Sequence, residues 1–139
     1  MKTVTIINGP NLNLLGKRET DIYGNQSFDV FLPELKRKFP SIHLEYFQSN
    51  VEGELINAIQ NAGLNNSSII LNPGGYTHTS VAIGDAIAAV QVPVIEVHIS
   101  NIFSREDFRK VSHVSAKSVG IISGLGLKGY ELALEYLSA

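Results

Sequence analysis

Short apolar runs rich in β-branched residues alternate along the chain with segments whose apolar residues recur at helical spacing. The strand-like runs lie at residues 3–8, 43–48, 68–72, 94–98 and 118–123. Helical spacing fits the segments 28–39, 51–62, 80–90, 105–111 and 128–137. Parallel strands need a crossover connection, usually a helix, so this alternation predicts an α/β fold with a five-stranded parallel sheet and helices on both faces.

Several residues predict where the helices begin and end. Ser49 and Glu52 fit a capping box at the start of the second helix, and Gly63 suits the left-handed position that ends it. Pro33 is unfavourable inside a helix, so the first helix is expected to begin later than residue 28. No composition shift or repeat divides the chain, and residues 1–139 are predicted to form one domain.

Composition narrows the classes of partner. The net charge is −2 and no basic stripe is present, which argues against a nucleic-acid partner. No run approaches the roughly 20 apolar residues of a membrane span, and no signal-peptide pattern is visible. A cytoplasmic protein is therefore expected. The chain has no cysteine and four histidines that lack ligand spacing, so no metal site is expected.

Polar residues gather where the predicted strands end. In open α/β sheets, ligands bind outside the carboxyl ends of the strands, at the point where strand order reverses. The side chains expected to converge there are Asn11, Asn72, His78, Glu96, His98 and Ser100. An asparagine after a strand is also a common turn residue, and that alternative stays open for Asn11 and Asn13.

Glu96 and His98 lie two positions apart on an apolar strand, so both point to the same face of the sheet. A buried carboxylate needs a partner, and an imidazole is a suitable one. This pattern favours a catalytic role, because a carboxylate that orients a histidine and raises its basicity is a common catalytic arrangement. A purely structural pair is the alternative.

The loop that follows the first strand, "NGPNLNLLGKRETDIYG" at residues 8–24, contains Arg18 and Tyr23. A free tyrosine has a pKa of about 10, and a nearby guanidinium favours its phenolate form, which can act as a base. From these two residues alone, an exposed arginine and a tyrosine packed under the loop are the better explanation.

The segment Gly124–Gly129 matches G-x-G-x-x-G, the phosphate-binding pattern of dinucleotide folds. Only ten residues follow it, so neither a further strand nor the expected acidic residue can exist. A tight turn between the last strand and the last helix is the better interpretation.

The segments "NGPNLNLLGKRETDIYG", "NPGGYTHTSVAIGDAI" and "VIEVHISNIFSREDFR" closely resemble the type II 3-dehydroquinate dehydratases, and the resemblance continues to "GLGLKGYELAL". It implies a flavodoxin-like fold and reversible dehydration of 3-dehydroquinate to 3-dehydroshikimate, without metal or organic cofactor. Two departures are visible: Gly75 replaces a usual alanine, and "RKVSHVS" at 109–115 lacks a histidine that often follows the basic pair.

The resemblance also implies residue roles. Tyr23 matches the base and Arg18 the residue that keeps it anionic. His98 matches the general acid, Glu96 its carboxylate partner, and Asn11 the residue that holds a water against the enolate. The positions that match substrate-binding residues are Asn72, His78, Asp85, Ile99, Ser100 and Arg109.

Asp85 matches a carboxylate supplied by a neighbouring subunit, in a homododecamer built as a tetramer of trimers. An exposed apolar pair, Ile102 and Phe103, is expected to contribute to contacts between subunits. Arg105 matches an arginine of unspecified role. The loop 8–24 is expected to act as a lid that excludes water.

Two competing classes share this fold pattern: a flavodoxin-like module that binds phosphate or flavin, and a structural assembly subunit. The loop after the first strand lacks the Ser/Thr-rich, helix-opening character of a phosphate cradle. A structural subunit would leave Tyr23 and the pair of Glu96 and His98 without a purpose.

Overall fold

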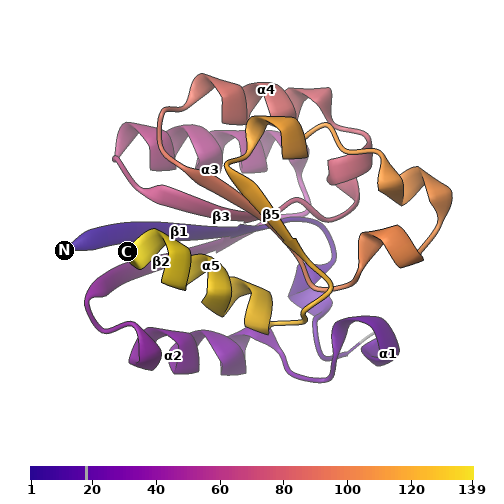
Figure 1. Cartoon of the computed structure of the whole chain (residues 1–139), viewed down its shortest axis with the longest axis horizontal. Helices are drawn as coiled ribbons and strands as arrows, with labels where there is room; N and C mark the ends of the chain where they lie inside the picture. The colour runs from indigo at the N-terminus through magenta and orange to yellow at the C-terminus, as the bar shows by residue number, and fades with distance from the viewer. Residues whose placement is uncertain (18) are drawn as a thin grey trace.

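Five parallel strands form one sheet in the computed structural model, which describes residues 1–17 and 19–139 (Figure 1). They are β1 (Lys2–Asn8), β2 (Ile42–Gln48), β3 (Ser68–Asn72), β4 (Val94–His98) and β5 (Gly120–Ser123). Their order across the sheet is β2-β1-β3-β4-β5. Strand order therefore reverses between β1 and β3.

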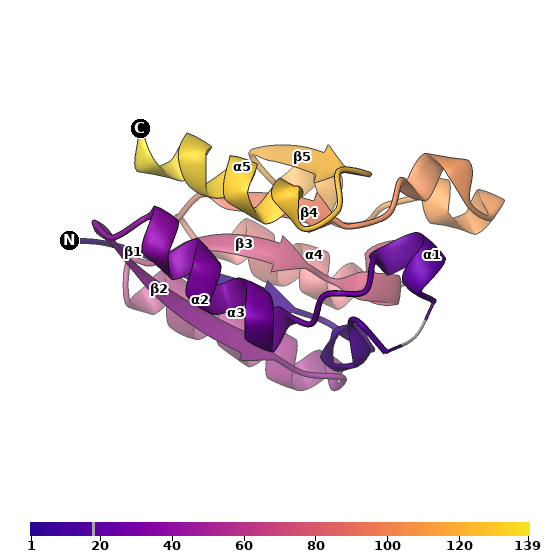
Figure 2. The ribbon, with the colours of Figure 1, turned by 90° about the horizontal axis from the view of Figure 1, so that it is seen from below.

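Helices cover both faces of the sheet (Figures 1 and 2). Buried residues of α2 (Phe28–Lys38) and α5 (Lys128–Ser138) share one apolar core with the sheet, and those of α3 (Glu52–Leu64) and α4 (Val81–Ala89) share another. Side chains of β1 alternate between the two cores, with Ile6 in the first and Ile7 in the second. The predicted flavodoxin-like α/β fold is confirmed.

Shorter segments extend beyond the carboxyl ends of the strands. They are α1 (Thr20–Tyr23) and the 3₁₀ turns η1 (Leu12–Leu14), η2 (Gly74–His78), η3 (Ile102–Ser104) and η4 (Asp107–Lys110). A further 3₁₀ turn, η5 (Ser115–Lys117), packs against α4 and leads into the start of β5. Both views place α1 and the segment that holds η3 and η4 beyond the same end of the sheet, away from the two termini.

The α-helix predicted at 105–111 is wrong, because this segment forms only the 3₁₀ turn η4. Its apolar residues Phe108 and Val111 are more than half exposed. The segment projects past the end of the sheet (Figure 1), so no sheet surface is available to bury an amphipathic helix there.

The predicted capping box is also wrong. Val51 occupies the N-cap of α3 and makes no side-chain cap. Ser49 Oγ instead accepts a hydrogen bond from the Val51 backbone N–H at 2.9 Å and donates to Glu54. Glu52 accepts from Ser80 Oγ at 2.5 Å, at the start of α4. Hydrogen bonds with Glu54 and Ser80 therefore replace the predicted reciprocal bonds between Ser49 and Glu52.

Two further boundary predictions are corrected. The helix α3 continues through Gly63 to Leu64, and the left-handed residue after it is Asn66, with φ 56°. Pro33 lies inside α2, which begins at Phe28 without delay. Burial of the apolar face of α2 outweighs the single backbone hydrogen bond that proline removes.

Across residues 1–17 and 19–139, every helix is too short or too polar to cross a bilayer.

Candidate active site

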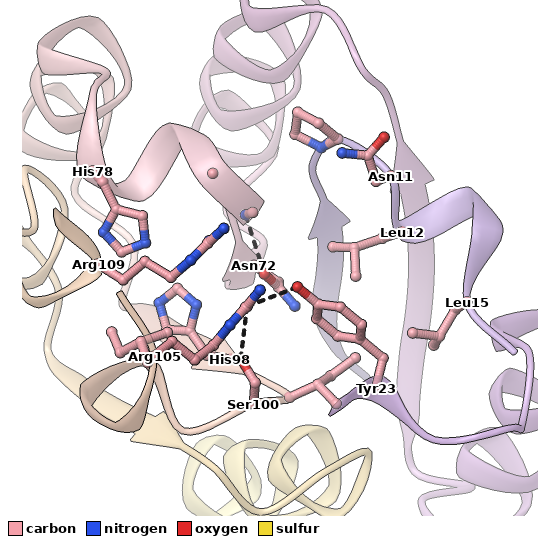
Figure 3. A pocket seen from close by; sticks show the side chains of 15 residues that line it. Asn11, Leu12, Leu15, Tyr23, Asn72, His78, His98, Ser100, Arg105 and Arg109 are labelled. Atoms are coloured by element: carbon pink, nitrogen blue, oxygen red, sulfur yellow. Dashed lines mark hydrogen bonds between the residues drawn. The ribbon is translucent and has the colours of Figure 1, made fainter. Parts of the chain in front are cut away.

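A pocket opens beyond the carboxyl ends of β1, β3 and β4, next to the reversal of strand order (Figure 3). This is the place where open α/β sheets bind ligands. Its lining consists of Pro10, Asn11, Leu12, Leu15, Tyr23, Asn72, Gly74, Gly75, His78, His98, Ile99, Ser100, Ile102, Arg105 and Arg109. Within this described lining there are two arginines and no acidic side chain, so the pocket suits an anionic ligand.

The loop after β1 forms one wall of the pocket. Gly9 lets it pack closely on the end of β3, because a Cβ there would lie 2.5 Å from the Pro73 carbonyl oxygen. Asn11 is left-handed, with φ 71°, and its backbone N–H donates to Asn50 Oδ1 at 2.9 Å. Its side chain faces the pocket, whereas exposed Asn13 is not part of the lining. Asn11 is therefore both a turn residue and a wall of the site.

Tyr23 lies at the end of α1 and points its hydroxyl into the pocket (Figure 3). Arg105 Nη1 donates to Tyr23 Oη at 2.8 Å and to Ser100 Oγ at 3.3 Å. The guanidinium carbon of Arg105 also lies 5.4 Å from the centre of the tyrosine ring. Arg105, for which the sequence specified no role, therefore brings a positive charge to the candidate base.

Arg18 lies outside the described residues, so its predicted contact with Tyr23 stays a prediction.

On β4, Glu96 and His98 form the predicted pair. His98 Nε2 donates to Glu96 Oε2 at 2.5 Å, and both side chains are almost completely buried. The other carboxylate oxygen, Oε1, accepts a hydrogen bond from Ser115 Oγ at 2.6 Å. Glu96 lies behind the pocket wall, and His98 forms part of it. The carboxylate therefore holds the imidazole in place from the buried side.

The segment 109–115 supplies that serine. Ser112 Oγ accepts from the backbone N–H groups of Val114 and Ser115, and it lies 2.9 Å from Ser115 Oγ. With both acceptor positions of Ser112 used, its hydroxyl proton is directed to Ser115, whose own proton is directed to Glu96. The unusual "RKVSHVS" stretch thus ends in a chain of donors aimed at the buried carboxylate.

His78 and Arg109 lie on the side of the pocket opposite Tyr23 (Figure 3). The backbone carbonyl of Val111 is 2.7 Å from His78 Nδ1, so Nδ1 carries the proton and Nε2 is the acceptor. Burial lowers the pKa of His78 below its ordinary value, and the positive charge of Arg109 adds to this. Arg109 Nε donates to exposed Glu106 at 3.1 Å and its guanidinium lies over the Phe108 ring.

Asp85 is the one predicted substrate-binding residue outside the described lining: it is exposed on α4. Ile102 is buried and lines the pocket, so the expected exposed apolar pair is wrong for Ile102 and right for Phe103, which is 55% exposed. A Cβ at Gly75 would meet nothing within 4 Å, so this turn has room for the alanine that the family usually has as well as for glycine.

Two other expectations concern cofactors. Among the residues that the structure describes, no group of three or more acidic, histidine or cysteine side chains could hold a metal ion. Gly124 and Gly126, both with positive φ, lie in the predicted turn between β5 and α5, and Gly129 lies in the first turn of α5.

Comparisons with known proteins show the family to which this chain is similar. The family model described as dehydroquinase class II matches residues 2–138. A 3-dehydroquinate dehydratase of Fusobacterium nucleatum is 56% identical, over 96% of this chain and 95% of its own. One of Prochlorococcus marinus is 51% identical, over 97% and 93%. The crystal structure of a type II dehydroquinase from Propionibacterium acnes superposes with a TM-score of 0.95 at 41% identity, covering 99% of this chain and 97% of that one.

Proposed function

The chain belongs to the class II dehydroquinase family and catalyses the dehydration of 3-dehydroquinate, and we propose that the pocket described above supplies both proton transfers of that reaction. A proton must leave the carbon next to the ketone, and the hydroxyl on the following carbon must depart as water. These two steps need a base and an acid. The observation that carries the assignment is that Tyr23 and His98 line the same pocket, and each is hydrogen-bonded to a charged side chain, Arg105 and Glu96 respectively.

On the base side, the phenolate of Tyr23 removes the proton. A hydrogen bond from a guanidinium stabilises a phenolate, and Arg105 makes this bond at 2.8 Å. Arg18, matched to the same task by its place in the family motif, would add a second positive charge. Both cations would also stabilise the enolate that forms when the proton leaves.

On the acid side, His98 protonates the departing hydroxyl. Its Nε2–H is held by Glu96, which leaves Nδ1 as the nitrogen that carries the transferable proton. Glu96 holds the imidazole in its orientation from the buried side. The Ser115 hydroxyl satisfies the second oxygen of this carboxylate.

The remaining lining residues hold the substrate. In this proposal Arg109 binds the substrate carboxylate, which a guanidinium binds in a fork. Substrate hydroxyl groups bind to Asn72, Ser100 and the unprotonated Nε2 of His78, and Ile99 packs against the substrate ring. Asn11 holds a water at the enolate oxygen. The loop 8–24 closes over the bound substrate and excludes bulk water.

Addition of 3-dehydroquinate tests the proposal, because the conjugated enone product, 3-dehydroshikimate, absorbs in the ultraviolet. The Tyr23→Phe variant should lose about 10²-fold to 10⁴-fold in kcat while it still binds an anionic substrate analogue, since only a proton-transfer group is removed. Tyr136→Phe, at a tyrosine that is 61% exposed on α5, is the matched control and should behave like the parent. Parental turnover by Tyr23→Phe would remove Tyr23 from the mechanism.

We further propose that the enzyme assembles as trimers, four of which form a dodecamer, and that Asp85 completes the site of a neighbouring subunit. Asp85 is exposed on α4 and lies apart from its own pocket. Apolar Phe103, Phe108 and Val111 are each more than half exposed, a pattern typical of contact surfaces. In this proposal residues 1–139 act as one catalytic domain. The enzyme works in the cytoplasm, and cell fractionation followed by the enone assay would test this location.

A further inference from the structure

A tyrosine hydroxyl lies buried in the core directly beneath the pocket. Tyr130 belongs to α5, is completely buried, and packs edge-on against Phe28 with ring centres 5.0 Å apart. Its hydroxyl extends to the carboxyl ends of β1 and β3. There it donates to Asn8 Oδ1 at 2.8 Å and accepts from Asn72 Nδ2 at 2.9 Å. Of these residues, Asn72 lines the pocket.

The donor and acceptor in each of these hydrogen bonds follow from the group at one end of the chain of bonds, the backbone N–H of Gly74. The backbone N–H of Gly74 can only donate, and it donates to Asn72 Oδ1 at 3.2 Å. The nitrogen of the Asn72 amide must therefore face Tyr130, whose oxygen accepts and whose single proton goes to Asn8. The chain of hydrogen bonds continues from Asn8, whose Nδ2 donates to Tyr46 Oη at 3.3 Å.

These hydrogen bonds fix the orientation of the Asn72 side-chain amide. Its oxygen is used by Gly74, and one of its two N–H bonds is used by Tyr130. The second N–H is available to a ligand in the pocket. Burial raises the pKa of Tyr130, so its hydroxyl keeps its proton and the direction of the chain does not change with pH.

We propose that Tyr130 is a positioning residue that holds the Asn72 amide with one N–H turned toward a substrate hydroxyl oxygen. The inference rests on the proposed substrate-binding role of Asn72. Packing alone does not account for the tyrosine: a phenylalanine would fill the same space, and burial of a hydroxyl is unfavourable unless it is hydrogen-bonded.

Tyr130→Phe tests this role, with Tyr46→Phe as the matched control. Both variants remove one phenolic oxygen from the same chain of hydrogen bonds. Tyr46 lies at the outer end, is only partly buried and does not line the pocket, so water can replace its hydroxyl. Tyr130→Phe should raise KM for 3-dehydroquinate about tenfold with a smaller change in kcat, while Tyr46→Phe should stay within about twofold of the parent.

A double-mutant cycle with Asn72→Ala distinguishes positioning from general stability. If Tyr130 acts through Asn72, the double variant should lose no more kcat/KM than Asn72→Ala alone. Losses that multiply, or parental KM and kcat in Tyr130→Phe, would overturn the inference while leaving the proposed function intact. Parental kinetics in Asn72→Ala would instead remove the substrate-binding role on which the inference rests.

Asn8→Ala serves as a second variant if Tyr130→Phe folds poorly. It removes the acceptor of the Tyr130 proton, so that proton would compete for Asn72 and turn its amide. Asn8 does not line the pocket, yet the variant should raise KM in the same way. An unchanged KM in folded Asn8→Ala protein would overturn the inference.

Discussion

Arg105 donates a hydrogen bond to the phenolic oxygen of Tyr23 across 2.8 Å, although the two residues are 82 positions apart in the chain. The same guanidinium nitrogen reaches Ser100 at the end of β4. Tyr23 on α1 is thereby tied to the strand that also supplies His98, and the candidate base and acid are placed in one pocket.

Arg105→Ala should lower kcat by about 10²-fold or more, because the candidate base Tyr23 loses its hydrogen bond from a positively charged guanidinium. Arg105→Lys should recover only part of the rate, since a lysine keeps the charge but loses the planar guanidinium that also lies beside the Tyr23 ring. Steady-state kinetics by the enone absorbance would measure both. Arg37→Ala, at an exposed arginine of α2, is the control. Equal activity in the Arg105→Ala and Arg37→Ala variants would show that Arg105 has no part in the reaction.

Ser115→Ala should lower both activity and stability, because Glu96 Oε1 loses its donor inside the protein. A buried acceptor without its partner costs about 1–3 kcal/mol of unfolding free energy, and kcat should fall about tenfold because the carboxylate that orients His98 is no longer held in place. Urea unfolding and kinetics measure the two effects. Ser118→Ala removes a hydroxyl that donates to the Val114 backbone carbonyl and should leave kcat unchanged. The prediction fails if Ser115→Ala keeps parental kcat.

The stability of the native state should depend on pH through His78. Burial lowers the pKa of this histidine in the folded protein, whereas the unfolded chain has the ordinary value of about 6.5. Below that pH the unfolded state binds a proton that the native state does not, so the free energy of unfolding decreases as pH falls.

His78→Asn should lose less stability than the parent between about pH 7 and pH 5. Urea unfolding across this range measures the slope, with His43→Asn at an exposed histidine as control; identical slopes in parent and His78→Asn would contradict the prediction.

Two inactive variants should restore activity when they share an oligomer. In a mixed trimer of Asp85→Ala and Tyr23→Phe subunits, a site is intact when its own Tyr23 and the neighbour's Asp85 are both present. Joint unfolding and refolding at equal amounts should therefore recover up to about a quarter of the parental activity. Subunits refolded separately and then assayed together are the control. No recovery, or light scattering that shows an active monomer, would contradict the shared site.

Borohydride added during turnover should neither inactivate the enzyme nor add mass to it. A Schiff-base mechanism needs a lysine kept partly neutral by a desolvated pocket, and no lysine belongs to the described lining. Lys17, within the loop 8–24, is exposed. Mass spectrometry of the treated protein is the measurement, and a reduced lysine adduct would replace the tyrosine-base mechanism.

Local patterns in the sequence were sufficient to predict the sheet and part of the site. Short runs rich in β-branched apolar residues indicate strands, so all five strands were located and their carboxyl ends indicated the pocket. The pairing of Glu96 with His98 followed from a spacing of two on one strand. These features depend on residues that are close in sequence, and backbone geometry alone brings them together.

Tertiary structure decided the features that depend on distant partners. Ser49 and Glu52 have the composition of a capping box, yet hydrogen bonds to Glu54 and Ser80 took its place. The segment 105–111 has helical spacing and forms only a short turn, because the sheet ends before it. The contacts of Arg105 with Tyr23, Ser115 with Glu96 and Tyr130 with Asn72 join elements far apart in the chain. No local propensity encodes such a contact, since it exists only when the packed sheet brings the two elements within hydrogen-bonding distance.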